Sequence, residues 1–120
     1  MNVQIITRNG QAIVECLPDG QQLASEDDAL ELIAACGEND TPRLLLHAEN
    51  LPADFYRLST GLAGRLLLKF SNYRLRVAAV LPLELTRQGR FHEMVLETNR
   101  GNEFRVFQDR EAAEQWLVEG

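Results

Sequence analysis

Two short polar segments hold the residues that could do chemistry. HAEN, residues 47–50, places His47 and Glu49 two positions apart, directly after a short apolar run. On an extended backbone, alternating side chains point to the same side, so this imidazole and this carboxylate could act as a general acid and base. A histidine that ends a buried strand can instead be a hydrogen-bonded structural residue, and the sequence leaves both interpretations open.

The second segment is Ser59-Thr60-Gly61, which precedes the apolar run LAGRLLLKF. Hydroxyl side chains at a helix start cap the helix, and the free N–H groups there favour anions. We therefore consider three alternatives for this turn, namely simple capping by Ser59 or Thr60, anion binding, and phosphorylation of Ser59. The predicted binding region comprises both segments: His47, Glu49, Asn50, Ser59, Thr60 and Gly61.

No catalytic residue, metal site or cofactor is predicted for this chain. The sequence has no Ser-His-acid arrangement, Gly-rich phosphate loop or paired-carboxylate signature. Cys16 and Cys36 lie in apolar surroundings without the CxxC or His-rich spacing of a zinc site. We expect both to be buried free thiols.

Charge restricts the class of partner. The net charge of −6 argues against general nucleic-acid binding, which requires a basic stripe. Eight acids and no base lie between Arg8 and Arg43, whereas five bases and no acid lie between Asp54 and Glu84. Two solvated faces would explain this segregation, and so would a basic segment that meets an anionic ligand, a protein partner or a second copy of the chain.

The chain is expected to form a single domain over residues 1–120. No apolar run approaches the ~20 residues that span a bilayer. The start of the chain, MNVQIITRNG, lacks the pattern of a signal peptide. We therefore expect a cytoplasmic protein without a membrane partner.

The apolar patterns predict an α/β fold with the element order β-β-α-β-α-β-α-β-α. Asn9-Gly10 favours a tight turn between two strands, and alternating strands and helices imply a mostly parallel sheet with an antiparallel hairpin at its start. The expected strands lie at about 3–8, 11–16, 43–47, 74–81 and 104–107. The expected helices lie at about 25–37, 52–58, 60–72 and 91–98, and after Asp109.

A break is predicted in the helical stretch between Leu51 and Tyr73. One continuous helix there would be roughly 33 Å long, whereas a five-residue strand is only about 17 Å. We expect the break between Leu58 and Leu62, and we expect Gly64 to allow close packing of the second helix. Glu97 should lie at the edge of the sheet opposite HAEN.

Four motifs carry a resemblance to a known family: HAENL, the pattern F-x-x-L-x-T-G-L-A-G from Phe55, KFSNYR (69–74) and ETNRG (97–101). With these motifs the chain resembles the bacterial domain-of-unknown-function 4180 family over nearly its whole length. The resemblance implies a small bacterial α/β protein without an established activity.

A looser resemblance is to STAS domains of the anti-sigma-factor antagonist type. These domains share the predicted element order and carry an Asp-Ser-Ser-Gly or Asp-Ser-Thr-Gly turn before their second long helix. Leu58-Ser59-Thr60-Gly61 stands at the matching place, so Ser59 would correspond to the phosphorylated serine. Leu58 replaces the aspartate of that motif, and the segment before it is longer than the usual connection.

Two functions of different classes follow. The leading one is a non-enzymatic regulatory or interaction module of STAS-like type, which binds a protein partner, a second copy or a small anion near HAEN and STG. The alternative is a small-molecule-binding protein or small enzyme that uses His47 and Glu49 at the same sheet edge. A pocket at that edge would favour the alternative, and a flat edge would favour the interaction module.

Overall fold

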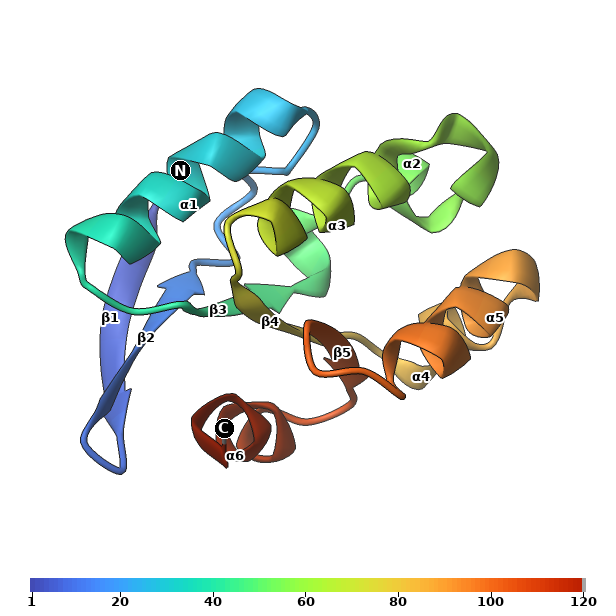
Figure 1. The fold of residues 1–120 in the computed structure, drawn as a ribbon. Coiled ribbons are helices and arrows are strands. Elements are labelled where there is room, and N and C mark those ends of the chain that lie inside the picture. Colours follow the sequence, from blue (N-terminus) through green and yellow to red (C-terminus); the bar gives the residue numbers. More distant parts are fainter. Residues whose placement is uncertain (120) are drawn as a thin grey trace.

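The computed structural model describes residues 1–119, and its strands form one sheet in the order β1-β2-β3-β4-β5 (Figure 1). β1 and β2 pair antiparallel, and every later neighbour pair is parallel. This confirms the predicted mixed sheet with an N-terminal hairpin. The strands are β1 (Val3–Arg8), β2 (Gln11–Cys16), β3 (Arg43–His47), β4 (Arg76–Val80) and β5 (Phe104–Phe107).

The helices follow the predicted order, with short additions. Two brief 3-10 turns flank α2, and α4 is a single turn that the apolar pattern did not indicate. The α-helices are α1 (Glu26–Glu38), α2 (Ala53–Tyr56), α3 (Leu62–Asn72), α4 (Leu83–Thr86), α5 (Gly89–Thr98) and α6 (Arg110–Glu119). The 3-10 helices are η1 (Ala48–Asn50) and η2 (Leu58–Thr60). No helix within residues 1–119 is long and apolar enough to cross a membrane.

The sheet separates two hydrophobic cores. Successive crossovers step along the sheet in one direction, so right-handed connections place α1, α3 and α5 on the same face. Figure 1 shows α1 and α3 above the sheet and α6 below it. Strand side chains alternate between these layers. Val14, Leu44, Val77 and Val106 belong to the first core, and Ile13, Leu45 and Ala78 belong to the second.

Among the helices within residues 1–119, only α6 packs on the second face, and two arginines bind backbone oxygens at its C-terminal end. Arg43 Nε donates to Leu117 O at 3.1 Å, and Arg76 Nη2 donates to Trp116 O at 2.8 Å. Cations are favourable at the negative end of a helix dipole. The Arg76 guanidinium also lies 4.0 Å from the Trp116 ring centroid, and that tryptophan is buried in the core.

The predicted break between α2 and α3 is confirmed. α2 ends at Tyr56, η2 occupies 58–60, and Gly61 adopts a left-handed φ of 79° before α3 begins. The N-cap of α3 is therefore Gly61 rather than Ser59 or Thr60. The expectation for Gly64 is wrong, because a Cβ built at that residue meets nothing within 4 Å.

Both cysteines are free and buried, as expected. Cys16 and Cys36 are 0% and 1% exposed. Burial raises the pKa of Cys16 to about 11 and that of Cys36 to about 12. The thiolate is the reactive form of cysteine, so neither side chain is suited to nucleophilic chemistry near neutral pH.

Candidate functional site

HAEN lies at the carboxyl end of β3, but its backbone does not align the side chains of His47 and Glu49 in the way expected. The chain turns into η1 immediately after His47, so the extended geometry that would align the two side chains is absent. Glu49 is exposed. The partner of His47 is instead Glu15 on β2, whose Oε2 lies 2.6 Å from His47 Nε2. We expected an extended backbone over His47 to Glu49, and the structure has a short 3-10 turn there instead.

Glu15 is the centre of a buried polar cluster on the face covered by α6. Its side chain is only 2% exposed. Arg110, at the start of α6, binds both carboxylate oxygens, with Nη1–Oε2 at 2.5 Å and Nη2–Oε1 at 2.6 Å. Gln4 on β1 donates to Oε1 at 2.7 Å. The cluster thus ties β1, β2, β3 and α6 together.

The donors of this cluster determine the charge of Glu15. Burial alone would raise the pKa of this carboxyl group, but hydrogen bonds from Arg110, Gln4 and His47 outweigh burial and lower its pKa to about 2. Because an ionised carboxylate only accepts hydrogen bonds, His47 Nε2 must carry the donated proton. The ring is thereby oriented, and its side chain is 15% exposed.

The side chain of Asn50 also forms hydrogen bonds within the fold. Its Oδ1 accepts from the His47 backbone N–H at 2.8 Å, and its Nδ2 donates to Leu17 O at 3.0 Å. The residue is completely buried. Asn50 therefore holds the HAEN turn against the segment that follows β2, and its amide is turned away from solvent.

The STG turn lies on the other side of α2. Thr60 Oγ1 contacts two backbone oxygens, Asp54 O at 2.6 Å and Arg57 O at 2.9 Å, and it accepts from Leu62 N–H at 3.2 Å. Thr60 therefore closes the turn between α2 and α3. Ser59, by contrast, is exposed.

The two predicted segments are close through α2 and do not form a single pocket. Tyr56 OH, at the end of α2, donates to Ala48 O at 3.4 Å and so connects the STG side to HAEN. Three cavities of about 370, 310 and 380 Å³ occur in the described chain, and none is lined by a residue of the predicted binding region. None of these three cavities therefore coincides with the binding region predicted from the sequence.

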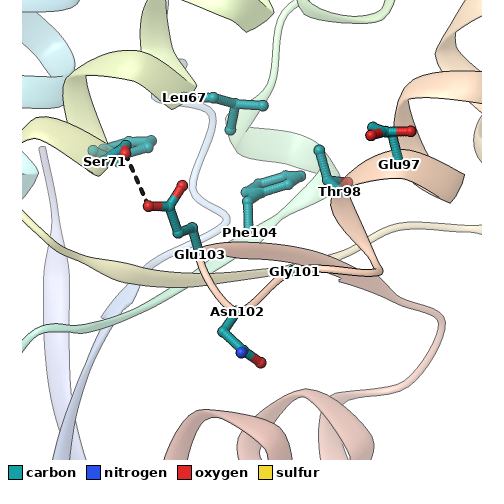
Figure 2. Close-up of a pocket in the computed structure, with 9 residues that line it drawn as sticks. Leu67, Ser71, Glu97, Thr98, Gly101, Asn102, Glu103 and Phe104 are labelled. Atoms are coloured by element: carbon teal, nitrogen blue, oxygen red, sulfur yellow. Dashed lines mark hydrogen bonds between the residues drawn. The ribbon is translucent and has the colours of Figure 1, made fainter.

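The cavity of about 370 Å³ lies at the opposite edge of the sheet, between the C-terminal parts of α3 and α5 and the start of β5 (Figure 2). Its apolar wall consists of Leu67, Phe70 and Phe104. Glu97, Thr98, Gly101, Asn102, Glu103 and Ser71 complete the lining. Glu97 thus lies near the amino ends of the parallel strands, whereas HAEN lies at their carboxyl ends, as expected.

Carboxylates give this cavity its charge. Glu97 and Glu103 both contribute to the lining, and no lysine or arginine does. Ser71 Oγ donates to Glu103 Oε1 at 3.0 Å, and Figure 2 shows this contact at the α3 side of the cavity. No single motif of the sequence indicated this site. Two of the sequence motifs meet at this cavity. KFSNYR supplies Phe70 and Ser71, and ETNRG supplies Glu97, Thr98 and Gly101.

The comparison with protein families gives one match. The model of the family described as Domain of unknown function (DUF4180) matches residues 8–117. The match therefore includes β2 to β5 and nearly all of α6. No curated protein and no solved structure matches the chain.

Proposed function

The chain belongs to the DUF4180 family, whose description names no activity, and we propose that it is a non-enzymatic interaction module of STAS-like type. In this proposal it binds a protein partner in the cytoplasm through the turn 57–61 and the adjoining HAEN edge. The element order shared with STAS domains supports the STAS-like type, with α2 and α4 as short additions. Fold alone does not carry function, so the proposal depends on the turn.

The observation that carries the proposal is an exposed Ser59 in a turn that has an exposed arginine on each side of it in the chain. Arg57 and Arg65 are exposed, and within residues 1–119 no carboxylate lies at ion-pair distance from either guanidinium. Arg65 Nη1 lies 3.3 Å from Thr60 O, so this arginine folds back over the turn. An exposed hydroxyl just before α3, in a segment where the nearest charged residue on either side along the chain is an arginine, is suited to an anionic group.

Phosphorylation of Ser59 would act through this environment. A phosphate adds about −1.5 to −2 charges and three strong acceptor oxygens. Arg57 and Arg65 can donate to it, and the positive end of α3 favours it. The modified turn would then be close to neutral where the unmodified turn is positive, and this loss of positive charge is a physical basis for switching a partner on or off.

The alternative at the same edge is a small-molecule site or an enzyme that uses His47 and Glu49. The geometry gives it less support. His47 Nε2 is bound to the buried Glu15, Glu49 is exposed on η1, and the three cavities lie elsewhere. An exposed HAEN edge, at which the histidine is already hydrogen-bonded to Glu15, favours a surface that binds a partner over a pocket that holds a substrate.

The test is affinity capture from the native host with variants of Ser59. Ser59→Asp should lose the bound partner at least tenfold, because the carboxylate places a charge in the contact surface, while Ser59→Ala should retain it. Ser25→Asp is the matched control. Ser25 caps α1 by accepting from Asp28 N, and an aspartate can cap that helix equally well.

Intact-mass measurement of the protein from its native host should show one added phosphate. The switch is refuted if Ser59→Asp captures the same proteins as the wild type and the native protein carries no phosphate. A binding loss shared by Ser59→Asp and Ser25→Asp would show that added charge in general, rather than the STG turn, controls capture.

A further inference from the structure

We propose that the cavity between α3, α5 and β5 binds a small organic cation, an ammonium group carried on an apolar body. This site is separate from the turn 57–61 and lies at the opposite edge of the sheet. The inference therefore goes beyond the proposed interaction module and does not depend on it.

The size and wall of the cavity suit a small molecule. Ligand sites are concave, largely apolar, and have volumes of roughly 300–1,000 Å³. The cavity measures about 370 Å³, at the small end of that range. Leu67, Phe70 and Phe104 supply an apolar wall that can receive a ring or a branched alkyl group. Figure 2 shows Leu67 on α3 and Phe104 on β5, both beside the space that Glu103 borders.

The charge of the cavity selects a cation. Glu97 and Glu103 come from two different segments, the end of α5 and the residue before β5, and both line the same space. The lining contains no basic side chain that could neutralise them. An ammonium group can donate up to three hydrogen bonds, whereas a carboxylate or phosphate would be repelled.

Ser71 gives the site a defined geometry. Its hydroxyl donates to Glu103 Oε1, which leaves Oε2 and the remaining lone pairs of the carboxylate for a ligand. Thr98 Oγ1 donates to Val95 O at 3.3 Å, so its lone pairs are likewise available to a donor. A ligand ammonium at the free oxygen of Glu103 keeps its apolar body against the wall formed by Leu67, Phe70 and Phe104.

Binding can be tested by NMR titration of the isotope-labelled chain with probes that share one shape. The probes are phenethylammonium, 2-phenylethanol and 3-phenylpropionate, together with isopentylammonium as a non-aromatic cation. Both ammonium probes should shift the methyl resonances of Leu67 and the amides of Thr98 and Gly101 at millimolar concentration. The alcohol should bind more weakly, and the carboxylate should cause no shift.

A further arm distinguishes a free amine from a lysine side chain of a protein. N-acetyl-lysine methylamide carries the same ammonium on a capped backbone, and we expect it to bind more weakly than phenethylammonium because its peptide groups do not fit an apolar wall. Stronger binding of the capped lysine would overturn the assignment to a free small amine.

Variants then locate the charge. Glu103→Gln and Glu97→Gln should each weaken phenethylammonium binding by about twofold to fivefold, the effect of one exposed charge, and the double variant should weaken it further. Glu93→Gln is the control, because Glu93 is an exposed residue of α5 that does not line the cavity. The proposal is wrong if the neutral, cationic and anionic probes bind equally, if no ammonium probe shifts these resonances, or if the double variant binds like Glu93→Gln.

Discussion

At the scale of single residues, Glu15 is the most consequential side chain of the described structure. Its carboxylate is buried, and it is compensated by Arg110, Gln4 and His47. Breaking a buried ion pair leaves an uncompensated charge, which is more damaging than losing an exposed pair. The four residues come from four elements, so the cluster fixes the position of α6 relative to the hairpin.

The cluster predicts a specific loss of stability in acid. The pKa of Glu15 falls from the ordinary 4.5 to about 2 on folding. This difference is worth about 3 kcal/mol of stability, which is present above pH 4.5 and is lost as the pH falls from about 4.5 towards 2. Glu15→Gln should therefore flatten the pH dependence of the free energy of unfolding in this window, measured by urea titration.

The control for this prediction is Glu111→Gln. Glu111 forms an exposed pair with Arg8 at 2.6 Å, and such pairs contribute little in water. This variant should keep most of the acid dependence of the wild type. Equal acid profiles for Glu15→Gln and the wild type would contradict the role given to the buried cluster.

The hydroxyl groups of the STG turn differ in importance. Thr60→Ala removes a hydroxyl that closes the turn and should lower the free energy of unfolding by about 1 kcal/mol. Ser59→Ala alters an exposed residue and should change it by less than about 0.5 kcal/mol. Thermal unfolding followed by circular dichroism measures both effects, and Thr60→Ser should restore most of the loss. Equal effects of the two alanine variants would contradict the distinction.

At the scale of elements, the two glycines at the start of α3 have opposite roles. Gly61 has a φ of 79°, and a Cβ there would lie 2.9 Å from Arg65 Nη1, whereas Gly64 is helical with free space around it. Gly61→Ala should cost about 1 kcal/mol, and Gly64→Ala should stabilise by about 0.5–1 kcal/mol. Urea unfolding of this matched pair tests the assignment. A loss of stability in Gly64→Ala would show that this glycine has a packing role.

At the scale of the whole molecule, the acidic and basic segments are only partly neutralised within the chain. Lys69 of α3 lies 3.6 Å from Glu26 of α1, while Arg57, Arg65 and Arg74 are exposed. We expect these cations to support association, including self-association with the acidic face of a second copy. Such association should weaken as salt rises, because exposed charges are screened over about 10 Å at 0.1 M. Sedimentation velocity at low and high salt measures this, and a monomer in both would refute it.

Local signals in the sequence determined much of the fold. Asn9 and Gly10 both adopt positive φ, and the strands on either side have the predicted bounds 3–8 and 11–16. The Ser25 cap and the strand 43–47 were likewise predicted correctly. These features depend on turn chemistry, capping and short apolar or β-prone runs, which act between residues only a few positions apart. The length of the segment indicated that a break must occur before α3, and Ser59-Thr60-Gly61 indicated its place.

Only the tertiary structure decided the polar partners and the cavity. Glu15 meets His47 and Arg110 across 32 and 95 positions, and the cavity joins residues 67–71 to 97–104. Such contacts depend on which strands become neighbours in the sheet and on where along the strands each helix packs. The 3-10 helix η1 begins directly after His47, so the extended backbone that was expected to align His47 and Glu49 is absent. Propensity acts along the chain, whereas a site forms between segments that meet only after the chain has folded.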